Sequence, residues 1–169
     1  MPQEIMNQMN NIKYGWKDKY ENIHFNVDET FSNDYVLETP NEVLNNNVGV
    51  CWDQVELERN FFEKTNIKFK TFFIVHYDNN NCPTHTFLIY KDNNLYYWFE
   101  HSWERFRGIH SYKTEEEALK DIKSKFIKYE LNGNYIKNNL CIYKYEKPKY
   151  GINCLQFYKH CEHGENIII

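Results

Sequence analysis

Short runs in which aromatic and β-branched residues alternate with polar ones dominate the chain after residue 65. Segments 66–77 (NIKFKTFFIVHY), 84–90 (THTFLIY), 95–103 (LYYWFEHSW) and 140–145 (LCIYKY) have this pattern. Runs of this composition, bounded by residues that favour turns, predict β-strands. Segment 108–112 (GIHSY) predicts one further short strand.

Apolar residues at helical spacing predict an amphipathic helix that begins near Cys51. Val55, Leu57, Phe61 and Phe62 recur at intervals of three and four residues, with charged residues between them. The preceding segment, TPNEVLNN, has the start signals of a short helix, namely a threonine cap, proline at the first helical position and an early glutamate.

Three other helices are expected. Thr114, followed by three glutamates with Glu117 placed for a capping box, predicts a helix to about Glu130. Segment 153–160 (NCLQFYKH) predicts a final helix, and the chain up to about Tyr20 predicts another from a weak apolar period. Helices followed by an antiparallel sheet give an α+β fold, in which the cysteine-bearing helix packs on the sheet.

Length and composition favour one domain over residues 1–169. We expect a helical extension to about residue 38, a core over about 39–147, and a C-terminal helix or tail over 151–169. Apolar residues make up 41% of the chain, which excludes compositional disorder. The net charge is −4 without a basic stripe, so nucleic acid is not an expected partner.

No secretion signal and no apolar run of membrane-spanning length is present in the sequence. The expected location is therefore the cytosol, without a membrane partner. The chain has five cysteines at irregular spacing, an odd number that argues against a disulfide framework and leaves room for a reactive thiol.

Cys51 is the first candidate for that thiol, because a helix start offers unpaired N–H groups and the positive end of the helix dipole. Both stabilise a thiolate, whereas Asp53 in the same turn opposes one, so a nearby cation is required. The competing interpretation is a buried packing cysteine, which is the commoner role of a lone cysteine.

The hairpin formed by residues 84–90 and 95–103 supplies a candidate cation. If Asp92 and Asn93 form its turn, His85 falls opposite Glu100, and directly opposed residues share a sheet face. A carboxylate beside the ring would orient it and stabilise its charged form. His101 would then point to the opposite face, and a bulge would shift this register by one residue.

These segments resemble the transglutaminase-like superfamily. TPNEVLNNNVGVCWDQVELE is similar to its cysteine motif, THTFLIY to its histidine strand, and LYYWFEHSW to its acid strand. Aspartate is usual in the last strand, whereas this chain has Glu100 followed by His101. The resemblance covers about residues 40–103 and implies a papain-like core with Cys51, His85 and Glu100 as catalytic residues. The same order of residues occurs in papain-like proteases and arylamine N-acetyltransferases.

The implied function is thiol-dependent acyl transfer, through hydrolysis of an amide by a cysteine peptidase or amidase, with no cofactor or metal. Substrates would be peptides, proteins or small amides. The Cys51 N–H would be one donor to the oxyanion. Trp16 or one of Asn45–Asn47 is a candidate second donor, and Trp52 and His101 are possible accessory residues.

Three alternatives remain at this point: a transglutaminase or N-acyltransferase with an amine acceptor, a binding module that keeps the fold without chemistry, and a zinc-stapled interaction domain. The binding module predicts a buried Cys51 or a misplaced histidine. Zinc would use the C-terminal cluster of Cys154, His160, Cys161 and His163, although its spacing is atypical. The sequence leaves the substrate, the acyl acceptor and the oligomeric state open.

Overall fold

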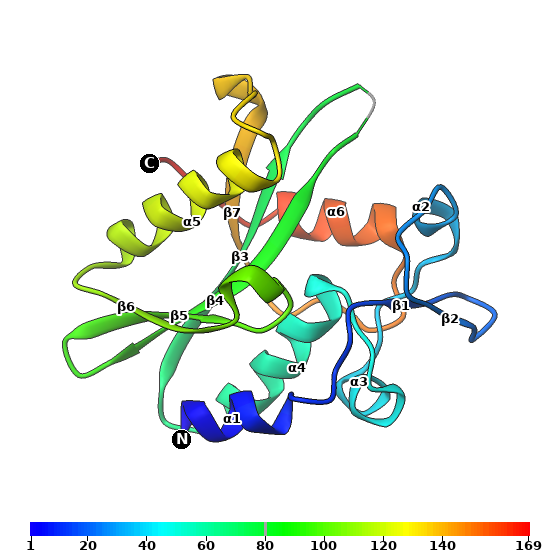
Figure 1. Ribbon diagram of the computed structural model, residues 1–169, viewed down its shortest axis with the longest axis horizontal. Helices are drawn as coiled ribbons and strands as arrows, with labels where there is room; N and C mark the ends of the chain where they lie inside the picture. Colours follow the sequence, from blue (N-terminus) through cyan, green and yellow to red (C-terminus); the bar gives the residue numbers. More distant parts are fainter. Residues whose placement is uncertain (80) are drawn as a thin grey trace.

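One antiparallel sheet organises the molecule (Figure 1). The computed structural model describes residues 1–79 and 81–169, and in this part of the chain six strands form the sheet in the order β6-β5-β4-β3-β7-β8. The strands are β3 (Lys68–His76), β4 (Thr84–Asp92), β5 (Leu95–Glu100), β6 (Gly108–Tyr112), β7 (Leu140–Tyr145) and β8 (Glu165–Ile167). The predicted antiparallel sheet and α+β class are confirmed.

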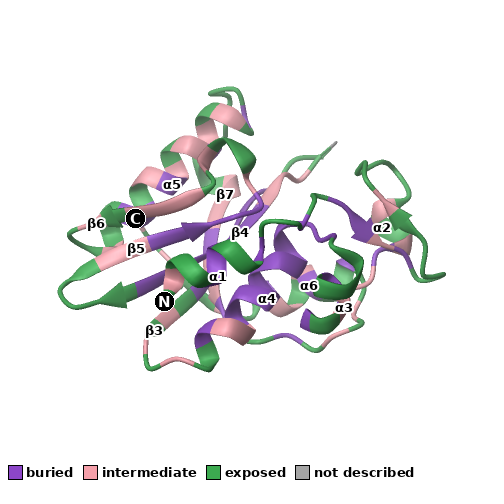
Figure 2. Ribbon diagram, turned by 60° about the horizontal axis from the view of Figure 1, so that its bottom comes forward, coloured by how far each residue is buried: buried purple, intermediate pink, exposed green. Residues whose placement is uncertain are grey.

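Helices cover both faces of the sheet, as Figure 2 shows for α5 on one side and α1 and α4 on the other. The longer helices are α4 (Cys51–Glu63), α5 (Glu115–Tyr129) and α6 (Cys154–Glu162), and the shorter α3 (Pro40–Asn46) precedes α4. Short elements are α1 (Pro2–Gln8), α2 (Phe31–Asp34), the 3₁₀ turns η1 (Glu104–Phe106) and η2 (Lys137–Asn139), and the hairpin of β1 (Trp16–Lys17) and β2 (Ile23–His24).

Alternate residues of β3 enter different cores, as the two-residue period of a strand requires. Phe72 and Ile74 pack in a cluster with α5, whereas Phe73 and Val75 pack with α4 and α6. Because both faces are buried, the strand reads as a continuous apolar run in the sequence. The central strands therefore fix the position of α4, whose first residue is Cys51.

Helix starts follow the predicted caps. The Thr39 hydroxyl accepts from the Glu42 N–H, and the Glu42 carboxylate accepts from the Thr39 N–H, which completes a capping box. Thr114 caps α5 through the Glu117 N–H, but the Glu117 carboxylate accepts from Lys113 N–H instead of closing the box. None of the helices in the described residues is long and apolar enough to cross a membrane.

The prediction of one helix up to about Tyr20 is wrong. Helix α1 ends at Gln8, and Trp16 and Lys17 form a strand instead. The physical reason is the tight approach of Gly15, where a Cβ would lie 2.5 Å from both a side-chain atom of Val48 and the carbonyl oxygen of His24. Long-range contacts of this kind override the weak helical period of this segment.

Candidate active site

Cys51 is the first residue of α4, at the end of a tight turn. Asn47 has a left-handed backbone with φ of 51°, and a Cβ on Gly49 would lie 3.0 Å from the Asp53 Cβ. Only a residue without a side chain fits this approach comfortably, so Gly49 lets the chain enter the helix directly. The thiol is placed where helix N–H groups are unpaired.

Asp53 fastens this helix start to the rest of the molecule. Its carboxylate accepts hydrogen bonds from the Tyr35 hydroxyl at 2.7 Å, the Glu38 N–H at 3.0 Å and the Val50 N–H at 3.0 Å. Burial raises the pKa of Asp53, while these donors act in the opposite direction. Asp53 thus caps the start of α4 through the Val50 N–H.

His85 and Glu100 form a buried hydrogen-bonded pair. The His85 Nε2 lies 2.8 Å from Glu100 Oε2, and both residues are almost fully enclosed. Glu100 is itself held by Trp98 Nε1 at 3.0 Å, Ser102 Oγ at 3.1 Å and the Trp103 N–H at 2.8 Å. A carboxylate with this many donors is a fixed support for the imidazole ring.

The other side of the His85 ring faces the thiol. The Cys51 side chain is near enough to interact with His85, and because Nε2 is occupied by Glu100, Nδ1 is the nitrogen left for the sulfur. Burial alone would lower the pKa of His85, but the charge of Glu100 and the hydrogen bonds to Cys51 and Glu100 outweigh it. The pKa of His85 therefore lies well above its usual range, which favours an imidazolium beside the thiol.

The predicted register of the hairpin is wrong by two residues. The turn is Asn93–Asn94, with Asp92 opposite Leu95, and the ladder between β4 and β5 ends at the pair Leu88 and Phe99. Asn93 takes the left-handed conformation that such a two-residue turn needs. A shift of two residues leaves every side chain on its face, so His85 and Glu100 still meet, now as diagonal neighbours.

His101 lies outside this pair, as its alternation with Glu100 predicts. Its Nδ1 is 2.7 Å from Gln54 Oε1, and Gln54 Nε2 donates to the Gly49 carbonyl at 2.7 Å. Gln54 therefore presents its oxygen to His101, so Nδ1 carries the proton, and the buried Nε2 has no hydrogen-bond partner among the described residues. Burial, followed by the charge of Arg107, lowers the pKa of His101 to about 4.

Of the residues suggested for the second oxyanion donor, Trp16 and Asn46 donate to other acceptors in the structure. The indole N–H of Trp16 donates to the Asn26 carbonyl at 2.9 Å, within a fully buried core. In the asparagine run, the Asn46 amide donates to Glu38 Oε2 at 3.0 Å. Trp52, the remaining accessory candidate, stacks on Phe157 with ring centroids 4.4 Å apart and helps to line the cavity at Cys51.

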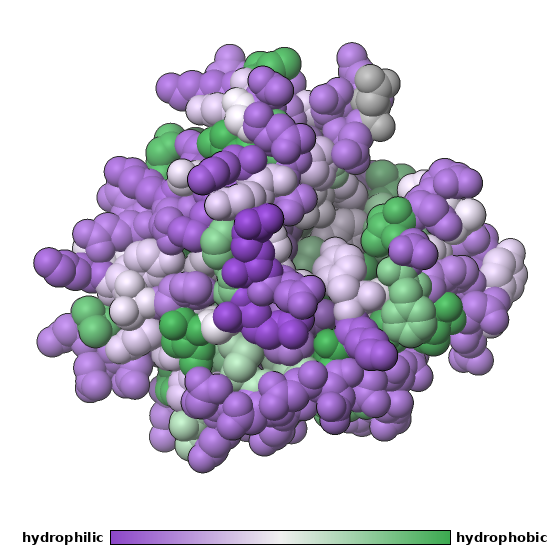
Figure 3. Space-filling view, viewed as in Figure 1, coloured by the Kyte–Doolittle hydropathy of each residue, from purple (hydrophilic) through white to green (hydrophobic). Residues whose placement is uncertain are grey.

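A cavity of about 610 Å³ opens beside Cys51. Figure 3 shows this face hollowed between the part that contains α2 and the hairpin of β1 and β2, and the rest of the molecule. The described lining residues are Tyr14, Val27, Asp28, Glu29, Phe31, Ser32, Val50, Cys51, Trp52, Asn81, Cys82, Pro83, Thr84, Cys154 and Tyr158. Cys51 is only 4% exposed, as the binding-module alternative predicts, but its histidine is in place.

The C-terminal cysteines and histidines are dispersed rather than clustered. His160 Nε2 bonds to the Glu146 carbonyl at 2.6 Å, Cys161 is fully buried, and Cys154 lines the cavity at Cys51. Within the described residues, no group of three or more histidine, cysteine or acidic side chains is arranged to hold a metal ion.

Two residues of the candidate site, Tyr14 and Gln54, could not be predicted from the sequence. Tyr14 reaches Cys51 because Lys13 pairs with Val48, a contact between residues far apart in the chain. The Gln54 link between the Gly49 turn and His101 is equally non-local. Only the helical spacing of Gln54 after Cys51 hints at its position.

Comparison with known proteins points to the same core. The family model described as a transglutaminase-like domain matches residues 4–128, a range that contains Cys51, His85 and Glu100. A search of curated proteins found no significant match. Since the family model covers most of the chain, and α4 packs on an antiparallel sheet, the protein belongs to the transglutaminase-like domain family.

Proposed function

We propose that the protein is a thiol-dependent acyl-transfer enzyme that hydrolyses an amide through Cys51, His85 and Glu100. One observation carries the proposal: a single imidazole ring is held between a helix-start thiol and a buried carboxylate, beside a cavity. Nucleophile, base and orienting group in this arrangement are the recurring parts of covalent acyl transfer.

The reaction would proceed in two steps. The Cys51 thiolate attacks the amide carbon with its proton already held on His85 Nδ1, and the tetrahedral oxyanion faces the Cys51 N–H. His85 returns the proton to the leaving amine, and a thioester remains. Water then attacks the thioester with His85 as base, which releases the carboxylic acid and restores the thiol.

Glu100 would keep the ring in the required orientation and stabilise the imidazolium. Its bonds to Trp98, Ser102 and the Trp103 N–H leave it little freedom, so the longer side chain in place of an aspartate has its own fitted support. The charge of Glu100 raises the pKa of His85, which favours the ion pair with a thiolate at neutral pH.

Selective alkylation tests the nucleophile. Iodoacetamide at about pH 6 should modify Cys51 faster than the other four cysteines, because the imidazolium stabilises the thiolate. Burial raises the pKa of Cys154 to about 11 and also raises the pKa of Cys161, so both are slow references. The advantage should vanish in His85→Ala. Labelling of Cys51 no faster than Cys154 in folded wild-type protein would refute the proposal.

A second candidate, transfer of the acyl group to an amine, is favoured by the charge of the cavity. Asp28 and Glu29 lie in its lining, and none of the described lining residues is lysine, arginine or histidine. Carboxylates near the thioester would attract a cationic acceptor. Water and an amine would then compete for the same acyl-enzyme, so both reactions share the first step.

A further inference from the structure

Tyr14 is carried to Cys51 by a backbone clasp. The Lys13 N–H donates to the Asn47 carbonyl at 2.9 Å, and the Gly49 N–H donates to the Lys13 carbonyl at 3.1 Å. This short parallel bridge ties the N-terminal segment to the turn that ends at Cys51. The backbone of the following residue, Tyr14, is therefore fixed beside the nucleophile.

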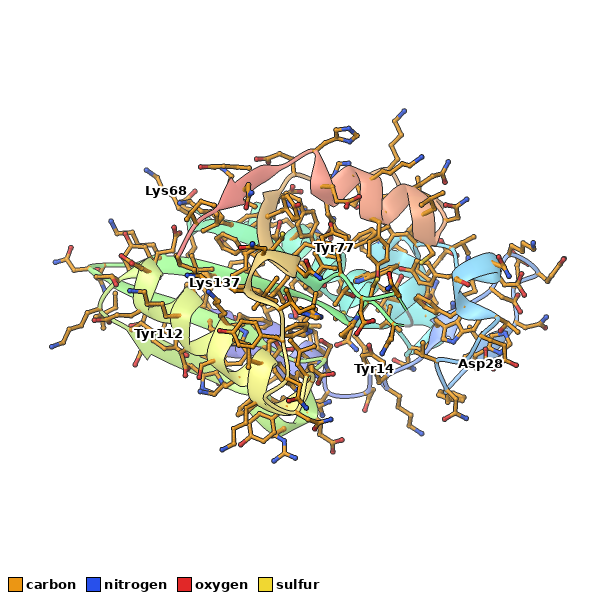
Figure 4. The ribbon with its side chains drawn as sticks, turned by 90° about the horizontal axis from the view of Figure 1, so that it is seen from above. Tyr14, Asp28, Lys68, Tyr77, Tyr112 and Lys137 are labelled. Atoms are coloured by element: carbon orange, nitrogen blue, oxygen red, sulfur yellow. The ribbon has the colours of Figure 1, made fainter. Side chains whose placement is uncertain are left out.

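The Tyr14 side chain reaches into the cavity at Cys51. Tyr14 and Asp28, both labelled in Figure 4, lie on the same side of the molecule, and both line this cavity. The residue is 46% exposed, so one flank of its ring faces solvent, while its hydroxyl end is enclosed by protein. That hydroxyl lies near enough to Cys51 to interact with its side chain and its backbone, and both residues line the same cavity.

The Tyr14 hydroxyl lies near the position that the carbonyl oxygen of a substrate would take. When a thiolate attacks a carbonyl, the carbonyl oxygen comes to lie close to the sulfur and to the N–H of the nucleophile. The Tyr14 oxygen occupies this region in the free protein. Burial, together with the neighbouring Cys51, raises the pKa of Tyr14 well above its usual range, so the group remains an O–H donor at working pH.

We propose that the Tyr14 hydroxyl is the second donor to the oxyanion that forms when Cys51 attacks an acyl substrate. This inference rests on the proposed function and fills the position that Trp16 and Asn46 cannot fill. An entering carbonyl oxygen would come to lie between the Cys51 N–H and the Tyr14 hydroxyl, and the half-exposed ring can turn to allow this. The O–H then donates to the same oxygen as the Cys51 N–H.

No bond to Tyr14 forms or breaks in this role. The electron pair of the sulfur forms the S–C bond, and the carbonyl π pair moves to the oxygen, where two hydrogen bonds stabilise it. Collapse of the intermediate returns the pair to the carbon and expels the leaving group. Tyr14 keeps its proton throughout, in accord with its raised pKa.

Two reagents separate this role from a general effect on the thiol. Acylation by p-nitrophenyl acetate forms an oxyanion, whereas alkylation by iodoacetamide does not. Tyr14→Phe should slow acylation of Cys51 by about 100-fold, the scale of losing one oxyanion donor, with alkylation of Cys51 changed less than about twofold. Tyr20→Phe, at an exposed turn, is the matched control and should change neither rate.

The ratio of the two rates is decisive, with mass spectrometry used to count modification at Cys51. Equal acylation in wild type and Tyr14→Phe overturns the donor role and leaves the proposed function standing. A parallel loss of both rates also overturns it, because Tyr14 would then act on the thiol itself. Failure of wild-type protein to be acylated at all overturns the proposed function, and this inference with it. Circular dichroism on each variant establishes that the fold is kept.

Discussion

Glu100 accepts hydrogen bonds from three side chains and one backbone N–H, so its length is matched to its surroundings. Glu100→Asp should therefore reduce kcat/KM by about 10-fold or more despite the preserved charge, because a shift of roughly 1 Å in a positioned group is costly. Glu100→Gln should retain measurable activity, since an orienting residue contributes less than the nucleophile when removed alone.

The matched control for Glu100 is its neighbour His101, which bonds to Gln54 rather than to His85. Steady-state kinetics on Glu100→Asp, Glu100→Gln and a folded His101 variant would compare the two positions. Full activity in both Glu100 variants, together with loss in the His101 variant, would assign the orienting role to His101 instead.

His101 also predicts a pH dependence of stability. Its pKa is lowered to about 4 by burial, so between pH 6.5 and 4 the unfolded chain binds a proton that the folded protein does not. Its contribution to stability is therefore lost as the pH falls through this window, by at most about 1.4 kcal/mol per pH unit. His101→Asn keeps a donor near Nδ1 and cannot titrate, so its stability should fall less on acidification.

Urea unfolding of wild type and His101→Asn at several pH values would measure this difference. His85 has the opposite sign, because its raised pKa gives a contribution that is complete below about pH 6.5 and is lost as the pH rises through the folded-state pKa. The difference between the two proteins below pH 6.5 thus isolates His101. Parallel curves for both proteins in that window would contradict the prediction.

At the scale of elements, α4 is anchored at its start by Asp53. Asp53→Ala leaves the Tyr35 hydroxyl and the Glu38 and Val50 N–H groups without their acceptor. We expect a loss of about 3 kcal/mol in the free energy of unfolding, because buried unpaired donors cost about 1–3 kcal/mol. Tyr35→Phe removes only one partner and should cost about 1 kcal/mol. Equal small losses in both variants, measured by chemical denaturation, would contradict this account.

Local sequence signals were sufficient for most elements because the caps and strand patterns agree with the packing. The Thr39 cap, the start of α4 at Cys51 and strands β3 to β7 follow from short segments. The hairpin register does not follow from the short segments, because both Asp92–Asn93 and Asn93–Asn94 are plausible turns. Only the left-handed Asn93 decides between them. The even period of a strand preserved the meeting of His85 with Glu100 despite that error.

The N-terminal segment shows where local signals fail. Its conformation depends on the approach of Gly15 to Val48 and on the pairing of Lys13 with the turn before Cys51. These contacts join distant parts of the chain, so no window of neighbouring residues contains the information. The same clasp brings Tyr14 to the site, which is why the sequence suggested Trp16 and the asparagine run instead.

At the scale of the molecule, the described lining of the cavity contains acidic side chains but no basic ones, which predicts its choice of acceptor. Once Cys51 is acylated, a cationic amine such as lysine amide should capture more acyl group than an anionic amine such as glutamate. Asp28→Asn together with Glu29→Gln should reduce the preference for the cationic amine about fivefold. Neither low nor high salt should restore this preference in the double variant, whereas in wild-type protein it should weaken with ionic strength, as surface charge effects do.

Product analysis by mass spectrometry, at low and high salt, would measure this partition. The neutral double variant is the matched control, because it keeps the size of both side chains. Equal capture of both amines by wild-type protein at low salt would exclude electrostatic selection of the acceptor by the cavity. This conclusion would hold however much of the acyl-enzyme is hydrolysed by water.

The hairpin of β4 and β5 has a consequence for how the protein can vary in length. Its Asn93–Asn94 turn is at the opposite end from Glu100, and the ladder between them is regular from Asp92–Leu95 to Leu88–Phe99. Adding one residue pair to each arm at the tip would extend the ribbon outward and leave all inner pairs in place. The tip is thus a natural point for insertions, where a fluorophore or an affinity peptide could be grafted without touching the candidate active site.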